Sequence, residues 1–222
     1  MALRIDSEVG RLRRVIVHRP GLELARLTPS NVRDLLFDDV MWAGRAREEH
    51  DSFTAKLRDR GIEVLVWGEL LAEALDVEGA REFLQDRLTT ATQFGPALDA
   101  PLDAFIAETP AAELAELLVG GVLKADLPEP SATSLLWSHL DADDFLITPL
   151  PNTLFPRDSA SIIYGGVSLN PTSEPARKRE TLHARLVLNY HPAFAGASFL
   201  YGNDDLAHEP ATVGGGDVLV VG

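Results

Sequence analysis

The sequence Pro151-Asn152-Thr153-Leu154-Phe155-Pro156-Arg157-Asp158 separates two apolar runs, 145–147 and 162–164, which are typical of buried strands. Asp158 therefore stands where a loop enters a strand, beside an amide, an aromatic ring and an arginine. A carboxylate can accept two parallel hydrogen bonds from a planar guanidinium, and an aromatic ring can stack on such a cation. We predict a pocket for a small, flat, cationic ligand, with Asp158, Asn152 and Phe155 as its contacts. The alternative is that Asp158 pairs with Arg157 or caps a turn.

On both sides of this segment the pattern alternates between strands and helices. Thr28-Pro29 predicts the start of a short helix that runs through Leu36, and Gly61 is a natural end for a second helix. Glu174 to Tyr190 reads as a further helix. Strands are expected at 13–18, 62–66, 145–147, 162–164, 167–169, 199–200 and 217–221.

Between residues 69 and 140 strand signals are weak, and prolines separate several short amphipathic helices. We expect a helical insertion within an α/β framework. The predicted division is a first α/β part at 1–68, a helical insertion at 69–143 and a continued α/β part at 144–222. The chain stops directly after an apolar strand, and a strand edge needs a partner, so we expect the α/β part to be truncated.

Composition narrows the classes of partner. The 222 residues carry 34 acidic and 20 basic side chains, a formal charge of −14, which argues against nucleic acid as a partner. This charge would attract a cationic small molecule, although acidity also serves solubility. The absence of Cys excludes disulfides and thiolate zinc sites. No signal core and no stretch of about 20 apolar residues is present, so we expect a cytoplasmic protein without a membrane partner.

Other polar motifs give no cofactor site. Gly214-Gly215-Gly216-Asp217 lacks the spacing of a dinucleotide loop or a P-loop and predicts a bulge or a hairpin entry. The six histidines show no metal-ligand spacing, so neither a metal nor another cofactor is expected. The basic residues of 174–190, Arg177 among them, would by themselves be read as a solvated helix face.

Several motifs together resemble the bacterial arginine deiminases. They are the stretch from Ser7 to Gly21, Leu35-Leu36-Phe37-Asp38-Asp39, the loop at 151–158, 164–171 and 212–219. The resemblance covers nearly the whole chain but only the N-terminal half or so of a typical family member. It implies a five-bladed, pentein-like α/β propeller of ββαβ units with an inserted helical subdomain, present here in part.

The resemblance also implies a function. The family hydrolyses L-arginine to L-citrulline and ammonia: a Cys thiolate attacks the guanidinium carbon, ammonia leaves, and a His-activated water releases citrulline. It implies that Asp158 grips the guanidinium, that Asn152 and Phe155 line the pocket, and that Arg177 holds the α-carboxylate of the substrate. L-arginine is therefore the expected ligand.

The chain departs from the family pattern at Gly214, which stands where the family has its catalytic Glu. The family's catalytic His and Cys would lie beyond Gly222. We therefore predict that this chain alone is inactive as an arginine deiminase, a hydrolase of amidine C–N bonds. The alternatives are a non-catalytic arginine-binding or subunit-interaction protein, or one half of a split enzyme. The expected protein partners are accordingly further copies of this chain or a polypeptide that supplies a C-terminal half.

Overall fold

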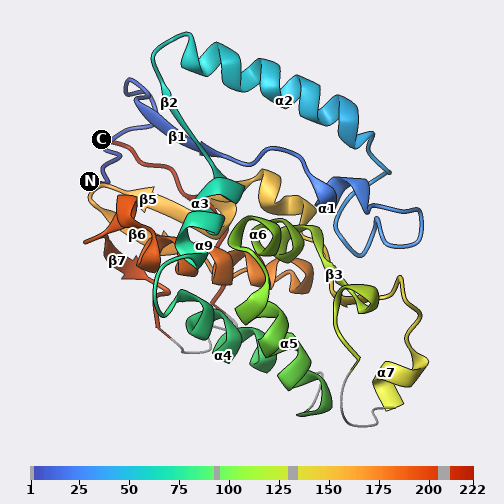
Figure 1. Cartoon of the computed structure of the whole chain (residues 1–222). Helices are drawn as coiled ribbons and strands as arrows, with labels where there is room; N and C mark the ends of the chain where they lie inside the picture. Colours follow the sequence, from blue (N-terminus) through green and yellow to red (C-terminus); the bar gives the residue numbers. More distant parts are fainter. Residues whose placement is uncertain (1–2, 93–95, 130–134, 205–210) are drawn as a thin grey trace.

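The structure, a computed structural model, describes residues 3–92, 96–129, 135–204 and 211–222. The α/β class predicted from the sequence is confirmed. Figure 1 shows α2 lying across β1 and β2, with α3, α6 and α9 at the centre and the two termini on the same side. The strands are β1 (Arg14–Val17), β2 (Glu63–Val66), β3 (Val122–Leu123), β4 (Phe145–Ile147), β5 (Ala160–Ile163), β6 (Gly166–Leu169) and β7 (Ser198–Tyr201).

The helices make up most of the middle of the chain. They are α1 (Leu22–Ala25), α2 (Ala43–Arg58), α3 (Trp67–Leu75), α4 (Ala80–Thr92), α5 (Pro96–Glu108), α6 (Ala111–Gly120), α7 (Leu135–His139), α8 (Pro156–Ser159) and α9 (Lys178–Tyr190). Short 3-10 turns lie at Lys124–Asp126, Pro151–Leu154, Pro175–Arg177, Pro192–Phe194 and Gly215–Asp217. Within the described ranges no helix is long and apolar enough to cross a bilayer.

The strands of the described residues form three small sheets, none of which is closed. β1 pairs with β2 in parallel, with Arg14 opposite Glu63, so the predicted strand, helix, strand order at the N-terminus is confirmed. β3 and β4 pair antiparallel. β5 and β6 form an antiparallel hairpin, and β7 returns after α9 to lie parallel to β6, which makes one ββαβ unit. Closure into a propeller stays a prediction.

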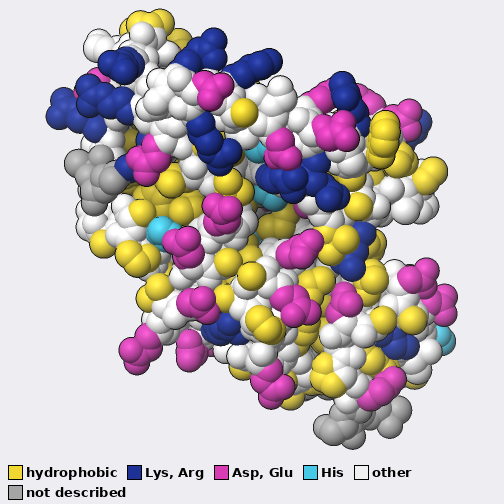
Figure 2. Space-filling view, turned by 45° about the horizontal axis from the view of Figure 1, so that its top comes forward, with side chains coloured by type: hydrophobic (Ala, Val, Ile, Leu, Met, Phe, Trp, Pro, Cys, Tyr) yellow, Lys and Arg dark blue, Asp and Glu magenta, His cyan; other side chains and the backbone are white. Residues whose placement is uncertain are grey.

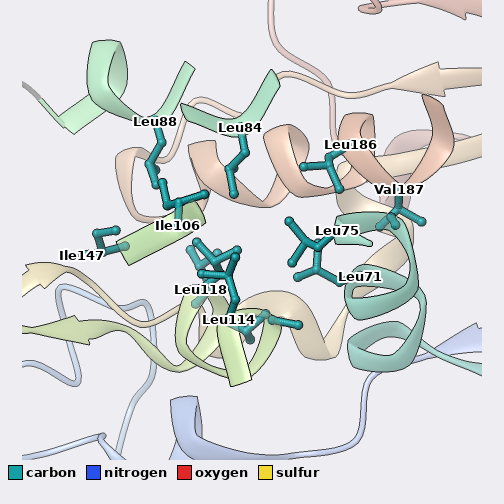
Figure 3. Close-up of a cluster of buried hydrophobic side chains, with 14 of the residues drawn as sticks. Leu71, Leu75, Leu84, Leu88, Ile106, Leu114, Leu118, Ile147, Leu186 and Val187 are labelled. Carbon is teal, nitrogen blue, oxygen red and sulfur yellow. The ribbon is translucent and has the colours of Figure 1, made fainter. Parts of the chain in front are cut away.

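One hydrophobic cluster joins the helices of the middle segment to the α/β parts (Figure 3). Leu71 and Leu75 of α3 and Leu118 of α6 have at most 1% of their surface exposed, and they meet Leu186 and Val187 of α9. Because burial of a Leu side chain contributes about 1.5–3 kcal/mol, this cluster is the main source of stability. It also fixes α9, whose first turn carries Glu180 to the candidate site and which directly follows Arg177, the last residue of the 3-10 turn Pro175–Arg177.

Two local predictions are wrong. Residues 29–36 form turns instead of a helix, because the side chain of Asn31 competes with the helical bonds: it accepts from the backbone N–H of Thr28 and donates to the carbonyl of Arg26. Leu36 then adopts a left-handed conformation with φ of 64°, which ends any helical path. The strand expected at 217–221 is not formed either: Asp217 belongs to a 3-10 turn, and residues 218–222 pair with no strand in the described part of the chain.

Charge is unevenly distributed over the surface. On the face shown in Figure 2, Lys and Arg side chains gather on the upper part, with several Asp and Glu side chains among them, whereas the lower part carries mostly Asp and Glu side chains. α2 contributes Arg45, Arg47, Lys56 and Arg58. The net negative charge of the whole chain therefore does not give the local charge of each face, and the charge of the candidate site depends on the residues that line it.

Candidate functional site

Asp158 lies in α8, a helix of only four residues that begins at Pro156 and ends at Ser159. Pro156 occupies the first helical position, where its missing N–H costs nothing, and Ala160 already has strand geometry. Asp158 has 31% of its side chain exposed and faces a cavity of about 340 Å³. This cavity is lined by Asp158, Ser159, Thr172, Ser173, Arg177, Glu180, Thr181, Thr212, Val213, Gly214, Gly216 and Asp217.

The backbone of Asp158 is fixed by a buried polar network centred on Asn170, which is fully buried at the end of β6. The Asn170 amide donates to the carbonyl of Asp158 at 3.1 Å and to Oγ of Ser161 at 2.8 Å. Ser168 donates back to Oδ1 of Asn170 at 2.8 Å. Because buried polar groups with every partner in place resist rearrangement, the network holds Asp158 at the rim of the cavity.

Arg177 is the cation of the cavity. Its Nη1 lies 2.8 Å from Oδ2 of Asp158, and its Nη2 lies 2.8 Å from Oε2 of Glu180. Nε also donates to Glu180, at 3.1 and 3.2 Å. Burial by itself would lower the pKa of Arg177, but the hydrogen bonds to Glu180 and Asp158 outweigh it and raise that pKa above its usual value.

Glu180 was not identified from the sequence. Its side chain is 4% exposed, and burial raises the pKa of this carboxyl, partly offset by the hydrogen bonds from Arg177. The signal that could have revealed it is the spacing of Arg177 and Glu180, three residues apart at a helix start, where an ion pair is favoured. Asp217 is a third carboxylate of the lining. Two carboxylates thus contact the guanidinium of Arg177, and a third lies elsewhere in the lining of the same cavity.

The glycine segment forms one wall of the cavity. Gly215–Asp217 is a 3-10 turn, in place of the bulge or hairpin entry predicted from the sequence. Arg157 holds it, donating through Nε to the carbonyl of Gly215 at 3.1 Å and through Nη2 to that of Val218 at 2.8 Å. Arg157 also pairs with Glu8 at 2.6 Å. The alternative that Asp158 pairs with Arg157 is therefore wrong, since Asp158 pairs with Arg177.

The predicted site residues fall into two groups. Asp158, Arg177 and Gly214 line the same cavity. Asn152 is buried. Its side-chain amide donates to the carbonyl of Leu35 at 2.8 Å, and its backbone carbonyl accepts a long hydrogen bond of 3.4 Å from Nη2 of Arg177. Phe155 is 50% exposed and is not among the described lining residues. Their roles toward a ligand stay predictions.

The described parts of the chain bring together no group of three His, Asp or Glu side chains that could hold a metal ion. The described lining of the cavity offers carboxylates, one guanidinium and hydroxyl groups. Such a set recognises a cation that can also offer an anionic group to Arg177.

A sequence model described as arginine deiminase matches residues 33–222, well over half of the chain. The chain therefore belongs to the arginine deiminase family. The family resemblance noted from the sequence motifs is confirmed by this match.

Proposed function

We propose that this member of the arginine deiminase family binds L-arginine in the cavity beside Asp158 and does not by itself convert it to citrulline. The observation that carries the proposal is the contact between Asp158 and Arg177. Asp158 already holds a guanidinium, at 2.8 Å, inside the cavity. A carboxylate that accepts a guanidinium of the protein has the access and orientation to accept that of a ligand.

The charges of the cavity favour the same ligand class. Asp158, Glu180 and Asp217 outnumber Arg177, so the lining carries a net negative charge. L-arginine brings a guanidinium for Asp158 and an α-carboxylate for Arg177, and the polar side chains of Thr172, Ser173 and Thr181 line the same cavity. A ligand with one cationic and one anionic end therefore complements the cavity better than a simple cation.

The hydrolysis implied by the family resemblance uses a Cys thiolate as its nucleophile. The sequence has no Cys, and Gly214 lines the cavity at the position where the family resemblance implies the catalytic Glu. Without a thiolate no covalent intermediate forms on the guanidinium carbon. Gly214 favours arginine binding without turnover as the role of this chain.

Isothermal titration calorimetry of the purified chain with L-arginine tests the proposal. Asp158→Asn keeps the shape of the side chain but removes its charge, so we expect the Kd to rise at least roughly tenfold, as is typical when one charged hydrogen-bond partner is lost. Asp59→Asn, at an exposed acid after α2, is the matched control and should leave the Kd unchanged.

A citrulline assay on the same preparation tests whether the chain converts L-arginine to citrulline. We expect no citrulline from the wild-type chain at any pH. Arginine binding that is equal in wild-type and Asp158→Asn protein would refute the placement of the ligand. Citrulline formation that disappears in Asp158→Asn would refute the absence of turnover.

A further inference from the structure

The Arg177 guanidinium is held by two carboxylates, besides a longer contact of 3.4 Å from Nη2 to the backbone carbonyl of Asn152, and the two carboxylate attachments are not equivalent. Glu180 accepts from Nε and from Nη2, that is, from one edge of the guanidinium. Asp158 accepts only from Nη1, at the other edge. Side-on contact through two nitrogens fixes the plane and direction of a guanidinium, whereas a contact through one nitrogen does not.

We infer that Glu180 is a positioning residue that keeps Arg177 at the cavity independently of Asp158, which leaves Asp158 free to exchange Arg177 for the guanidinium of a ligand. The inference deepens the proposed function and rests on it for the identity of the ligand. When Asp158 turns to the ligand, Nη1 of Arg177 becomes free while Nε and Nη2 stay on Glu180. The freed Nη1 is then the donor that meets the ligand's carboxylate.

Burial supports this division of roles. The Glu180 side chain is 4% exposed and sits in the first turns of α9, which the hydrophobic cluster fixes, so it has little freedom to follow a moving partner. Asp158 is 31% exposed and faces the open cavity. The exposed carboxylate is therefore the one available for exchange, and the buried one is the anchor.

The consequence is a preference for ligands with a carboxylate. Agmatine has the guanidinium of arginine but lacks the α-carboxylate, so it can use Asp158 but not the freed Nη1. In the wild-type chain we expect L-arginine to bind more tightly than agmatine. Glu180→Gln loses the charge that anchors Arg177 and should weaken L-arginine binding roughly tenfold, with agmatine binding changed less than about twofold. Glu174→Gln, an exposed acid on the preceding turn, is the matched control and should change neither.

A measurement without ligand tests the anchor itself. The Arg177 Nε–H should give a side-chain NMR signal protected from exchange, assigned by its loss in Arg177→Lys. In Asp158→Asn the signal should keep its position and protection, because Glu180 still accepts it. In Glu180→Gln it should shift and lose protection, while backbone signals of the hydrophobic cluster stay in place and so report an intact fold.

The possible outcomes distinguish a failure of the proposed function, arginine binding, from a failure of the inference that Glu180 anchors Arg177. If the wild-type chain binds neither ligand, the proposed function fails, and the NMR signal still decides the role of Glu180. If Asp158→Asn releases the Nε–H, or if Glu180→Gln leaves it protected, Glu180 is not the anchor and the inference is overturned. An equal loss of arginine and agmatine binding in Glu180→Gln would likewise overturn it, because that pattern reports a general structural effect.

Discussion

Gly214 lines the cavity and Gly215, the next residue, packs against Arg157 behind it, so the structure predicts opposite responses to the addition of one methyl group. A Cβ on Gly215 would overlap the carbonyl oxygen of Arg157 and come within 2.8 Å of Oγ of Ser161. The first of these is backbone and cannot turn away. A Cβ on Gly214 would have only Oδ2 of Asp217 near it, at 3.5 Å, which is ordinary contact. Gly214 also has φ of −103° and ψ of 147°, a conformation open to any residue.

The magnitudes follow from these two environments. Gly214→Ala loses no native contact and reduces the entropy of the unfolded chain, so it should stabilise the protein by about 0.4–1 kcal/mol. Gly215→Ala reduces the entropy of the unfolded chain in the same way. It also forces apart α8 and the glycine turn, and such overpacking costs about 1–3 kcal/mol. For a chain of this length each kcal/mol moves the Tm by roughly 2–4 °C.

Urea unfolding followed by circular dichroism measures both variants against the wild-type chain. We expect Gly215→Ala to have the lower free energy of unfolding and Gly214→Ala to match or exceed the wild type. Gly215→Ala should also weaken arginine binding, since the turn it displaces lines the cavity. Equal stability of the two variants would refute the close packing of Gly215 on Arg157.

Two further predictions concern the core. Burial lowers the pKa of the fully buried His183 to about 3, so the unfolded chain takes up the proton first and stability is lost as the pH falls from about 6.5. Between pH 7 and 5 this group should lower the free energy of unfolding by about 2 kcal/mol. Urea unfolding of His183→Leu at several pH values should lack this contribution. Leu118→Ala should lower the free energy of unfolding by about 2–5 kcal/mol, because Leu118 is fully buried, whereas Leu135→Ala, at a side chain that is 79% exposed, should change it by less than about 0.5 kcal/mol in the same assay.

The local elements could be predicted because their signals are local. Apolar runs bounded by glycine or proline predicted β1, β2, β5 and β6, and periodic leucines predicted the helices of the middle segment. The predicted helix after Thr28 failed for a reason visible only in three dimensions. Asn31 bonds back to Arg26, and the carbonyl of Leu35 is taken by Asn152, 117 residues away.

The site could be predicted only in part, because its contacts are non-local. The sequence predicts Asp158 and Arg177 as charged residues but not that they pair across 19 positions. Instead it offers Arg157 as the nearest partner for Asp158. Arg157 points the other way, to Glu8 and the glycine turn. Adjacent residues at a helix start project in different directions, so sequence neighbours are poor candidates for an ion pair there.

The segment 217–221 shows that an alternation of buried and exposed side chains does not by itself make a strand, because the backbone must also pair with a neighbouring strand. Val220 is 3% exposed and its neighbours Leu219 and Val221 are each 71% exposed, which is the alternation of a strand. Its backbone groups nevertheless find partners outside any ladder: the carbonyl of Val218 accepts from Arg157, and Val220 exchanges bonds with Glu8. The side chains of Arg157 and Glu8, together with the backbone N–H of Glu8, satisfy the polar groups that a neighbouring strand would otherwise take. Arg157 also donates to the carbonyl of Gly215, so the side chain that takes the place of a neighbouring strand at Val218 is the one that holds the glycine turn of the cavity wall.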